Sequence, residues 1–293
     1  MTTVIQPTGL VSAAVRVIDV HHMGRDRVTC SWEVGGVLID VGPEISHEAV
    51  VKALDGEAPR AILLTHIHLD HAGATGSLLQ KWPDVPVYVH EKGAPHLIDP
   101  SRLEASAGQL WDDMDERWGH TVPVPEGSIN LVGDGDSVLG FRVAYTPGHA
   151  SHHVSYFHEG SGWAFVGDVA GVRVAPETHT LMPTPPPDID VEAWHASLDT
   201  IEAWEPEGIG VAHFGAHEDP APVLADAHEQ LERWTAAARD LDGEEFLARY
   251  EADTAEKIRD ERILESLRQA NDPRLEYLGL ERYWRKLGHE RRG

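Results

Sequence analysis

Four side chains of the kinds that bind metal ions lie within six consecutive residues, directly after the apolar segment Ala61–Leu64. That segment predicts a buried strand. If strand geometry continues, two of the imidazoles share one side, because side chains two residues apart share a face. The other two side chains then lie on the turn before a helix-like segment over residues 74–81. Neutral imidazole and carboxylate suit zinc, iron or manganese, so the pattern predicts a metal site. In a chain with 19 histidines, a surface turn that is rich in histidine by chance is the alternative. The four residues are His66, His68, Asp70 and His71.

The overall composition excludes several classes of partner. A formal charge of −25, from 24 basic and 49 acidic residues, disfavours binding to a phosphate backbone, so nucleic acid is not an expected partner. No apolar run approaches the roughly 20 residues that a membrane helix needs, and Met1–Leu10 lacks a signal-peptide pattern. The single cysteine, Cys30, rules out an intrachain disulfide and is expected to pack in a strand. We therefore expect a cytoplasmic protein without a membrane partner.

Apolar segments alternate with turn residues through most of the chain, which predicts a mixed fold of strands and helices. Within residues 90–120, apolar residues from Leu103 to Met114 recur at helical spacing and predict an amphipathic helix. This helix is expected either to form a lid over a pocket or to pack in the ordinary way. Strands are expected at Ala14–Val20, Val28–Val34, Val37–Val41, Val85–Val89, Ile129–Val132, Val138–Tyr145, His153–His158 and Trp163–Val166.

The sequence His-x-His-x-Asp-His after an apolar strand resembles the signature of the metallo-β-lactamase superfamily. The resemblance extends over residues 12–217 and implies an α+β fold, the αββα sandwich, in which two β-rich halves each carry flanking helices. It resembles most the branch of glyoxalase II and the lactonases. We therefore expect a catalytic domain over residues 1–217 and an α-helical C-terminal extension over residues 218–293.

The resemblance implies three further metal ligands, each at the end of an apolar strand. His149 follows Thr-Pro-Gly, whose Pro and Gly turn the backbone sharply. Asp168 follows an apolar run and Gly167, and it resembles the bridging aspartate of the superfamily. A carboxylate suits that role because its two oxygens can each bind one cation. His213 follows the strand-like residues 209–212. His152 and His153 are alternatives to His149, and His217 is an alternative to His213.

By the same resemblance, seven residues hold two metal ions, which we expect to be zinc, with iron or manganese as alternatives. One ion would be bound by His66, His68 and His149, and the other by Asp70, His71 and His213, with Asp168 between them. A hydroxide that bridges the two ions would be the nucleophile. Asp70 would act catalytically by relaying a proton to the leaving group.

The expected reaction is hydrolysis of an ester, lactone or thioester carbonyl in a small-molecule substrate. Residues 169–173 lack the Gly-Cys-Gly-Arg-like stretch of glyoxalase II, which disfavours a glutathione thioesterase. The alternatives are an iron-dependent oxidoreductase of the same fold, resembling persulfide dioxygenases or diiron proteins, and a phosphodiesterase. A metal-stabilised binding module without turnover is a further alternative.

Two loops and the C-terminal residues have open roles in the sequence. The loop His21–Arg25 either contacts substrate or forms a polar turn, and Leu181–Pro187 either walls an apolar pocket or forms a rigid connector. An apolar stripe predicts one helix over 224–241, a second over Glu244–Ala270, and a third that starts at Pro273 with Asp272 as its N-cap. These helices are expected to cover the pocket mouth, form a homodimer interface, or pack on the sheet.

Overall fold

The computed structural model describes residues 9–10 and 14–288 of the chain. Most of Met1–Leu10, whose sequence was expected to lack a signal peptide, therefore lies outside the described residues. Among the described residues, no helix combines the length and the apolar character that a membrane span requires.

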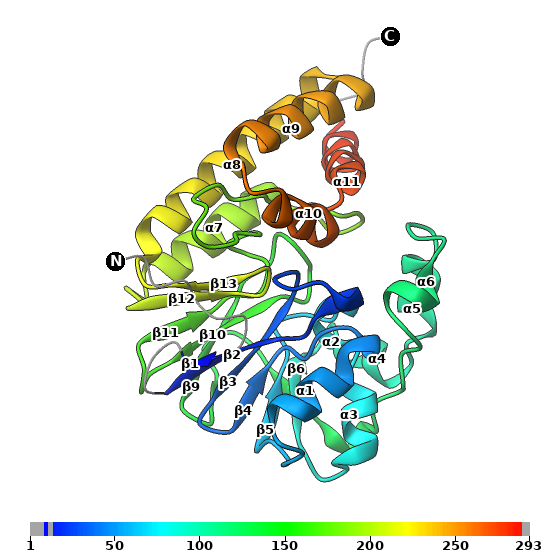
Figure 1. Ribbon diagram of the computed structural model, residues 1–293, viewed down its shortest axis with the longest axis vertical. Helices are drawn as coiled ribbons and strands as arrows, with labels where there is room; N and C mark the ends of the chain where they lie inside the picture. The colour runs from blue at the N-terminus through cyan, green and yellow to red at the C-terminus, as the bar shows by residue number, and fades with distance from the viewer. Residues whose placement is uncertain (1–8, 11–13, 289–293) are drawn as a thin grey trace.

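Two β-sheets form the centre of the molecule (Figure 1). The first runs in sequence order from β1 to β7, and the second has the order β13-β12-β11-β10-β9-β8. Strands β4 to β7 are parallel to one another, as are β11 and β12, and the other neighbours are antiparallel. The first sheet consists of β1 (Gly9–Leu10), β2 (Val15–Asp19), β3 (Cys30–Val34), β4 (Val37–Ile39), β5 (Ala61–Leu63), β6 (Val87–His90) and β7 (Ile129–Val132); the second consists of β8 (Ser137–Val138), β9 (Phe141–Tyr145), β10 (Val154–His158), β11 (Trp163–Phe165), β12 (Gly208–Val211) and β13 (Gly215–His217).

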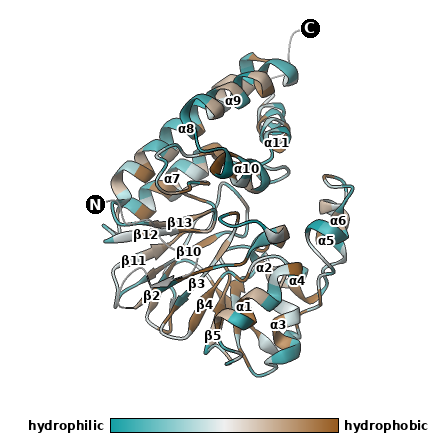
Figure 2. Ribbon diagram, in the orientation of Figure 1, coloured by the Kyte–Doolittle hydropathy of each residue, from teal (hydrophilic) through white to brown (hydrophobic). Residues whose placement is uncertain are grey.

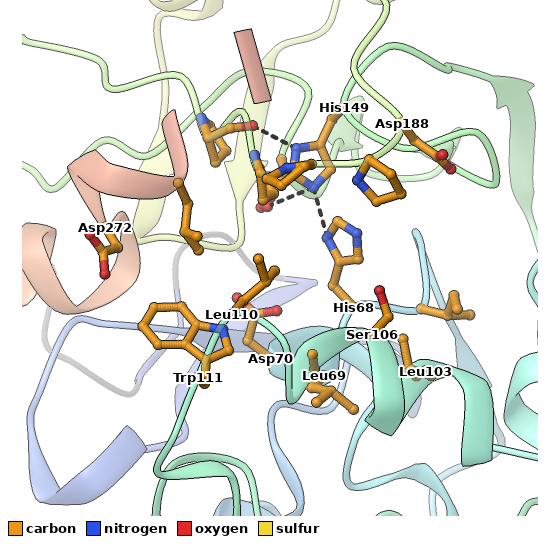
Figure 3. A pocket seen from close by; sticks show the side chains of 18 of the residues that line it. His68, Leu69, Asp70, Leu103, Ser106, Leu110, Trp111, His149, Asp188 and Asp272 are labelled. Atoms are coloured by element: carbon orange, nitrogen blue, oxygen red, sulfur yellow. Dashed lines mark hydrogen bonds and ion pairs between the residues drawn. The ribbon is translucent and has the colours of Figure 1, made fainter. Parts of the chain in front are cut away.

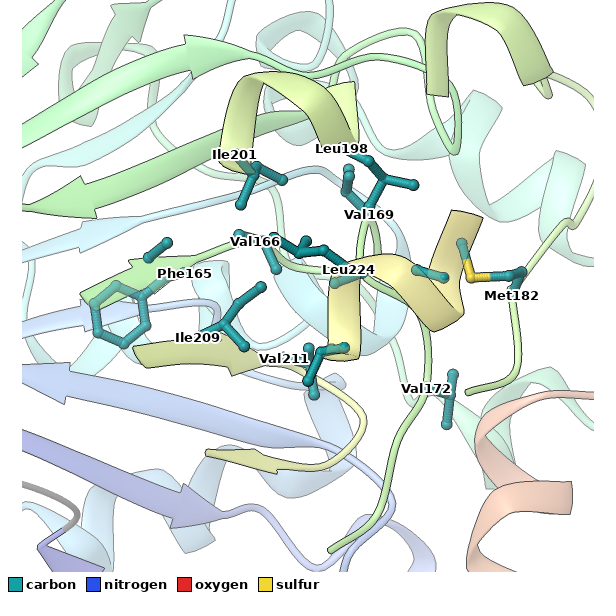
Figure 4. Packing of buried hydrophobic residues seen from close by; sticks show 14 of the residues in the cluster. Phe165, Val166, Val169, Val172, Met182, Leu198, Ile201, Ile209, Val211 and Leu224 are labelled. Atoms are coloured by element: carbon teal, nitrogen blue, oxygen red, sulfur yellow. The ribbon is translucent and has the colours of Figure 1, made fainter. Parts of the chain in front are cut away.

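Helices cover the outer face of each sheet. Val50 of α1 and Leu78 of α3 are buried in one cluster with Ile62 of the first sheet. Figure 4 shows Leu198 of α7 and Leu224 of α8 beside residues of the second sheet. The layers are therefore helix, sheet, sheet and helix, which confirms the predicted αββα sandwich. The helices are α1 (His47–Ala53), α2 (Leu69–Ala72), α3 (Thr75–Lys81), α4 (Ala94–Ile98), α5 (Ser101–Ala107), α6 (Met114–Arg117), α7 (Val191–Glu202), α8 (Pro220–Asp240), α9 (Gly243–Lys257), α10 (Glu261–Ala270) and α11 (Pro273–Lys286), with 3₁₀ turns η1 (His22–Gly24), η2 (Glu44–Ser46) and η3 (Glu126–Ser128).

Aromatic rings fill the space between the two sheets. The ring of Trp32 in β3 lies 5.5 Å from that of Phe165 in β11, and both side chains are buried. Gly210 of β12 faces these rings, so that an added Cβ atom would lie 2.8 Å from Trp32 and 2.9 Å from Phe165. The lone cysteine, Cys30, is buried in β3, as expected.

We expect Gly210→Ala to destabilise the fold by about 1–3 kcal/mol, because a fully packed core accommodates an extra methyl group only by displacing its neighbours. Urea unfolding would show the loss as a lower midpoint with an unchanged slope. Gly133→Ala is the matched control, since an added Cβ atom there has nothing within 4 Å. Equal midpoints for wild type and Gly210→Ala would contradict this description of the core.

Two elements differ from the sequence prediction, besides the helix expected within residues 90–120, which is the two short helices α5 and α6. The single strand expected at Val138–Tyr145 is a hairpin, β8 and β9, in which Val138 pairs with Phe141. Leu139 and Gly140 both have positive φ, at 52° and 88°, which a two-residue hairpin turn requires. The helix expected at Glu244–Ala270 is two helices, α9 and α10, because Asp260 caps a new helix by accepting a hydrogen bond from Arg262 N.

The four C-terminal helices α8–α11 pack on one another beside the second sheet (Figure 1). Their buried residues belong to the same hydrophobic cluster as the sheet interior, and Figure 2 shows polar and apolar residues alternating along them. Asp272 caps α11 as predicted, by accepting a hydrogen bond from Arg274 N. Leu278 and Leu287 on or beside α11 remain 46% and 52% exposed, and a homodimer through these helices stays a prediction.

Candidate metal centre

The predicted strand, turn and helix junction is present in the structure. Strand β5 ends at Leu63, and His68 directly precedes the short helix α2, whose first turn carries Asp70. The carbonyl of Thr65 accepts a hydrogen bond from Val154 N at 2.8 Å, which joins this junction to the second sheet. The junction therefore lies where the ends of both sheets meet.

Three imidazole nitrogens form the first of two groups. His66 Nε2 lies 3.1 Å from His68 Nδ1, and His149 Nε2 lies 2.9 Å from the same atom. All three rings belong to buried or partly buried residues. Ligand atoms of a tetrahedral zinc site are separated by roughly 3.3 Å, which follows from zinc–nitrogen bonds of about 2.0–2.1 Å. The three nitrogens are therefore close enough together to bind one metal ion.

The second group contains two imidazoles and a carboxylate. His213 Nε2 lies 3.2 Å from His71 Nε2 and 3.3 Å from Asp70 Oδ2. The distance from His71 Nε2 to Asp70 Oδ2 is 3.8 Å. His213 comes from the turn after β12, so this group joins a residue of the second sheet to two residues of the α2 turn.

Asp168 lies between the two groups and directs one oxygen to each. Its Oδ2 is 3.3 Å from His149 Nε2, whereas its Oδ1 is 3.3 Å from His71 Nε2 and 3.5 Å from His213 Nε2. Oδ1 is buried and has no hydrogen-bond partner among the described residues. An unsatisfied buried oxygen is costly, and a cation would remove that cost. The residues present therefore fit a pair of metal ions.

The outer nitrogens of three imidazoles contact fixed acceptors. His149 Nδ1 donates to the Pro183 carbonyl at 2.8 Å, and His213 Nδ1 donates to the Val28 carbonyl at 2.7 Å. His71 Nδ1 lies 2.9 Å from Asp40 Oδ2. Because carbonyls and carboxylates only accept, each Nδ1 carries a hydrogen, and Nε2 is the ring nitrogen that faces the centre and can bind a metal ion.

Asp40 was not identified as a site residue from the sequence. Its Oδ1 accepts a hydrogen bond from Thr65 N and its Oδ2 accepts one from Thr65 Oγ1, both at 2.8 Å, in addition to the contact with His71. It directly follows β4, which pairs in parallel with the motif strand β5. An acidic residue at the end of a neighbouring apolar strand is the signal that would have found it.

Burial keeps the first group neutral. It lowers the pKa of His66 well below the usual value, lowers that of His68 to about 3, and also lowers that of His149. Neutral imidazole is the form that binds a metal ion. The three rings therefore carry no positive charge at neutral pH that would repel a cation.

The second group is more polar. Burial alone would lower the pKa values of His71 and His213, but the neighbouring carboxylates outweigh it and raise both. Burial also disfavours the ionised form of Asp168 and would raise its pKa. The charges of His71 and His213 outweigh burial and hold that pKa well below its usual range. Asp168 is therefore ionised at neutral pH.

A cavity of about 370 Å³ opens onto the centre through His68, Asp70, His149 and Asp168 (Figure 3). One part of the lining comes from the α5 region, where Leu103, Leu110 and Trp111 face the cavity. The predicted segment therefore contributes to the pocket, although it forms the short helices α5 and α6 instead of one helix. Further lining residues come from the loop between β11 and α7 and from α11. They include Pro183, Pro185, Pro186, Pro187, Leu275 and Glu276.

The two loops with open roles differ in their relation to the cavity. Pro183 and Pro185–Pro187 line it, as one of the two interpretations expected, whereas Leu181 and Met182 pack in the core. None of the residues of His21–Arg25 lines it. Instead, His22 Nε2 bonds to the Arg117 carbonyl, and Arg25 bonds to α10.

The alternative histidines lie outside both groups. His152 lines the cavity, with its ring stacked 6.1 Å from that of His66. His153 Nδ1 lies 3.0 Å from Thr146 Oγ1, behind the first group. His217 lies on β13, and burial lowers its pKa to about 4.

Comparisons with known proteins agree with this arrangement. Hydroxyacylglutathione hydrolase from Legionella pneumophila is 33% identical over 138 residues, which cover 46% of this chain and 44% of that protein. A probable metallo-hydrolase from Bacillus subtilis is 37% identical over 117 residues, 39% of this chain and 51% of that protein. The chain thus spans about half the length of these relatives.

A solved structure extends the likeness of fold to nearly the whole chain. The crystal structure of an archaeal metallo-beta-lactamase superfamily protein from Sulfolobus tokodaii matches with a TM-score of 0.68 and 23% identity, over 92% of this chain and 98% of that one. The model of the metallo-beta-lactamase superfamily matches residues 33–213, which include all the side chains of the two groups and Asp168. This chain belongs to the metallo-beta-lactamase superfamily.

Proposed function

We propose that the protein is a hydrolase with two bound metal ions, zinc in the first instance, that cleaves an ester, lactone or thioester bond in a small molecule. The observation that carries the proposal is Asp168, which directs one oxygen to each of two groups of ligand atoms. The relatives named as hydrolases support the reaction class. The ligands would be His66, His68 and His149 for one ion, Asp70, His71 and His213 for the other, and Asp168 for both.

When bound, two zinc ions would lower the pKa of a water molecule toward 7 and polarise a carbonyl oxygen. The chain supplies the remaining parts. Burial would raise the pKa of Asp70, but the charge of His71 and the hydrogen bond from His213 hold it below its usual range. Asp70 lines the cavity as an ionised carboxylate, so it can accept a proton and pass it to the leaving group.

The cavity walls favour a substrate with an apolar portion. Leu103, Leu110 and Trp111 line the cavity (Figure 3), and so do Pro183 and Pro185–Pro187. Such walls exclude water around an acyl chain or a ring, which strengthens the electrostatic interactions of the site.

Metal analysis of the purified protein is the first test. We expect about two zinc ions per chain, complete loss of hydrolysis after dialysis against a chelator, and recovery when about two equivalents of zinc are returned. A panel of lactones, thioesters, β-lactams and phosphodiesters would then define the substrate class. Asp168→Ala, purified in parallel, controls for a contaminating hydrolase.

Two outcomes would overturn the proposal. Full hydrolysis by metal-free protein would remove the metal from the mechanism. One iron per chain, with oxygen uptake in the presence of thiols or persulfides, would establish the oxidoreductase alternative instead.

A further inference from the structure

A single peptide group separates the metal centre from the C-terminal helix α11. The carbonyl of Pro183 accepts the hydrogen bond from His149 Nδ1 at 2.8 Å. The N–H of Thr184, on the other side of the same planar peptide group, donates to Glu276 Oε2 at 2.7 Å. Hydrogen bonds at both ends of one amide polarise each other. Through this peptide group, Glu276 makes the Pro183 carbonyl a stronger acceptor for the hydrogen bond from His149.

The side chain of Thr184 doubles this connection. Its Oγ1 donates to Glu276 Oε2 at 2.7 Å and lies 3.1 Å from the carbonyl of Glu276. Both residues are almost completely buried, at 1% and 2% exposure. Two donors from one residue fix the position of the carboxyl group relative to the loop, and they fix the loop relative to α11.

Close packing at Gly279 holds the same loop against α11. An added Cβ atom on Gly279 would lie 1.7 Å from the carbonyl oxygen of Thr184. Gly279 is three residues after Glu276, so both lie on the same face of the helix. Because Gly279 has no side chain, the backbone of α11 can approach the loop whose Pro183 carbonyl accepts the hydrogen bond from His149.

Glu276 makes no ion pair with a cation among the described residues. Burial raises the pKa of its carboxyl group well above the usual value, although the hydrogen bonds from Thr184 oppose that shift. Burying a carboxyl group costs free energy, and an apolar side chain would pack α11 without that cost. The hydrogen bonds that the Glu276 carboxyl group accepts both come from Thr184, so its polar role is at this loop.

We propose that Glu276 is a positioning residue of the metal centre, which acts through Thr184 and the Pro183 carbonyl to fix the orientation and tautomer of His149. This inference rests on the proposed function, in which His149 binds a metal ion. It makes α11 part of the metal site, although the helix lies more than 100 residues beyond His149 in the sequence.

Zinc affinity, measured by competition with a chromophoric chelator, tests the proposal without reference to activity. We expect Glu276→Leu to bind one of the two zinc ions about 10-fold more weakly than wild type, the low end of the effect of removing a direct partner of a ligand, because Glu276 acts through the Pro183–Thr184 peptide group. Glu276→Gln is expected to retain wild-type affinity, because its carboxamide oxygen accepts the same two hydrogen bonds from Thr184. Cobalt(II) substitution should show an altered visible spectrum only for Glu276→Leu.

Tyr283→Phe is the matched control on the same helix. It removes the hydrogen bond from Tyr283 to Glu192 and loosens α11 without touching Thr184. We expect its zinc affinity to be unchanged even where its thermal midpoint falls. Equal zinc affinity in folded Glu276→Leu and wild type, or an equal loss in Tyr283→Phe, would overturn the proposal.

A second variant covers the case in which Glu276→Leu does not fold. Thr184→Val removes only the Oγ1 donor, so we expect a smaller loss of zinc affinity in the same direction, and an unchanged affinity would overturn the inference. Failure of the proposed function is distinguishable, because it would show in wild type itself, as hydrolysis without metal or as one iron per chain with oxygen uptake, whereas failure of this inference shows only in the comparison of variants.

Discussion

Asp168→Ala is expected to hold at most about one zinc ion per chain and to hydrolyse substrate at least about a thousandfold more slowly than wild type. Asp168 directs one carboxylate oxygen to His149 of the first ligand group and the other to His71 and His213 of the second. Without it, the two groups lose their shared negative charge, and the charges of two cations would no longer be offset between them. A thousandfold loss corresponds to about 4 kcal/mol of transition-state stabilisation.

Elemental analysis and a rate measurement on the same sample test this prediction together. Asp188→Ala is the matched control, because Asp188 also lines the cavity but accepts its hydrogen bonds from Ser151 and belongs to neither ligand group. We expect the control to keep the wild-type metal content. An Asp168→Ala protein with full metal content and full rate would refute the bridging role.

The strands and the ends of strands were predictable because their signals are local. An apolar segment followed by turn residues defines both β5 and the position of the residues after it. The hairpin β8–β9 was missed because Leu139 adopts a positive φ that its residue type does not indicate. The break between α9 and α10 was missed because no glycine or proline marks it, and only the cap by Asp260 defines the boundary.

The outer contacts of the site were not predictable, because each depends on which distant segments pack together. The acceptors of His149 and His213 are backbone carbonyls, which every residue carries and which therefore leave no mark on the sequence. The link from Thr184 to Glu276 spans 92 residues. Such partners follow from the packing of helices on sheets, which residue spacing alone does not determine.

Asp40 is the outer contact whose loss we expect to be most informative. All three of its partners are donors: the backbone and hydroxyl groups of Thr65, and His71 Nδ1. Asparagine offers one acceptor oxygen and one amide donor, so Asp40→Asn cannot satisfy all three. Where its amide faces Nδ1, His71 adopts the other tautomer and places a hydrogen on the Nε2 atom that faces the second group. We therefore expect up to about a hundredfold weaker binding of one zinc ion and a stability loss of about 1–3 kcal/mol.

The backbone at this position makes asparagine a clean substitution, and a second aspartate provides the comparison. Asp40 has a φ of 52°, which asparagine also adopts readily, so backbone strain stays similar. Asp19 is another buried aspartate at the end of a strand, and it accepts hydrogen bonds from the backbone of His21 and Arg27. Urea unfolding in the presence of a chelator should show a loss of stability for both Asp40→Asn and Asp19→Asn. Only Asp40→Asn should also lose zinc in the competition titration; if both variants lost zinc equally, the cause would be general destabilisation and not the orientation of His71.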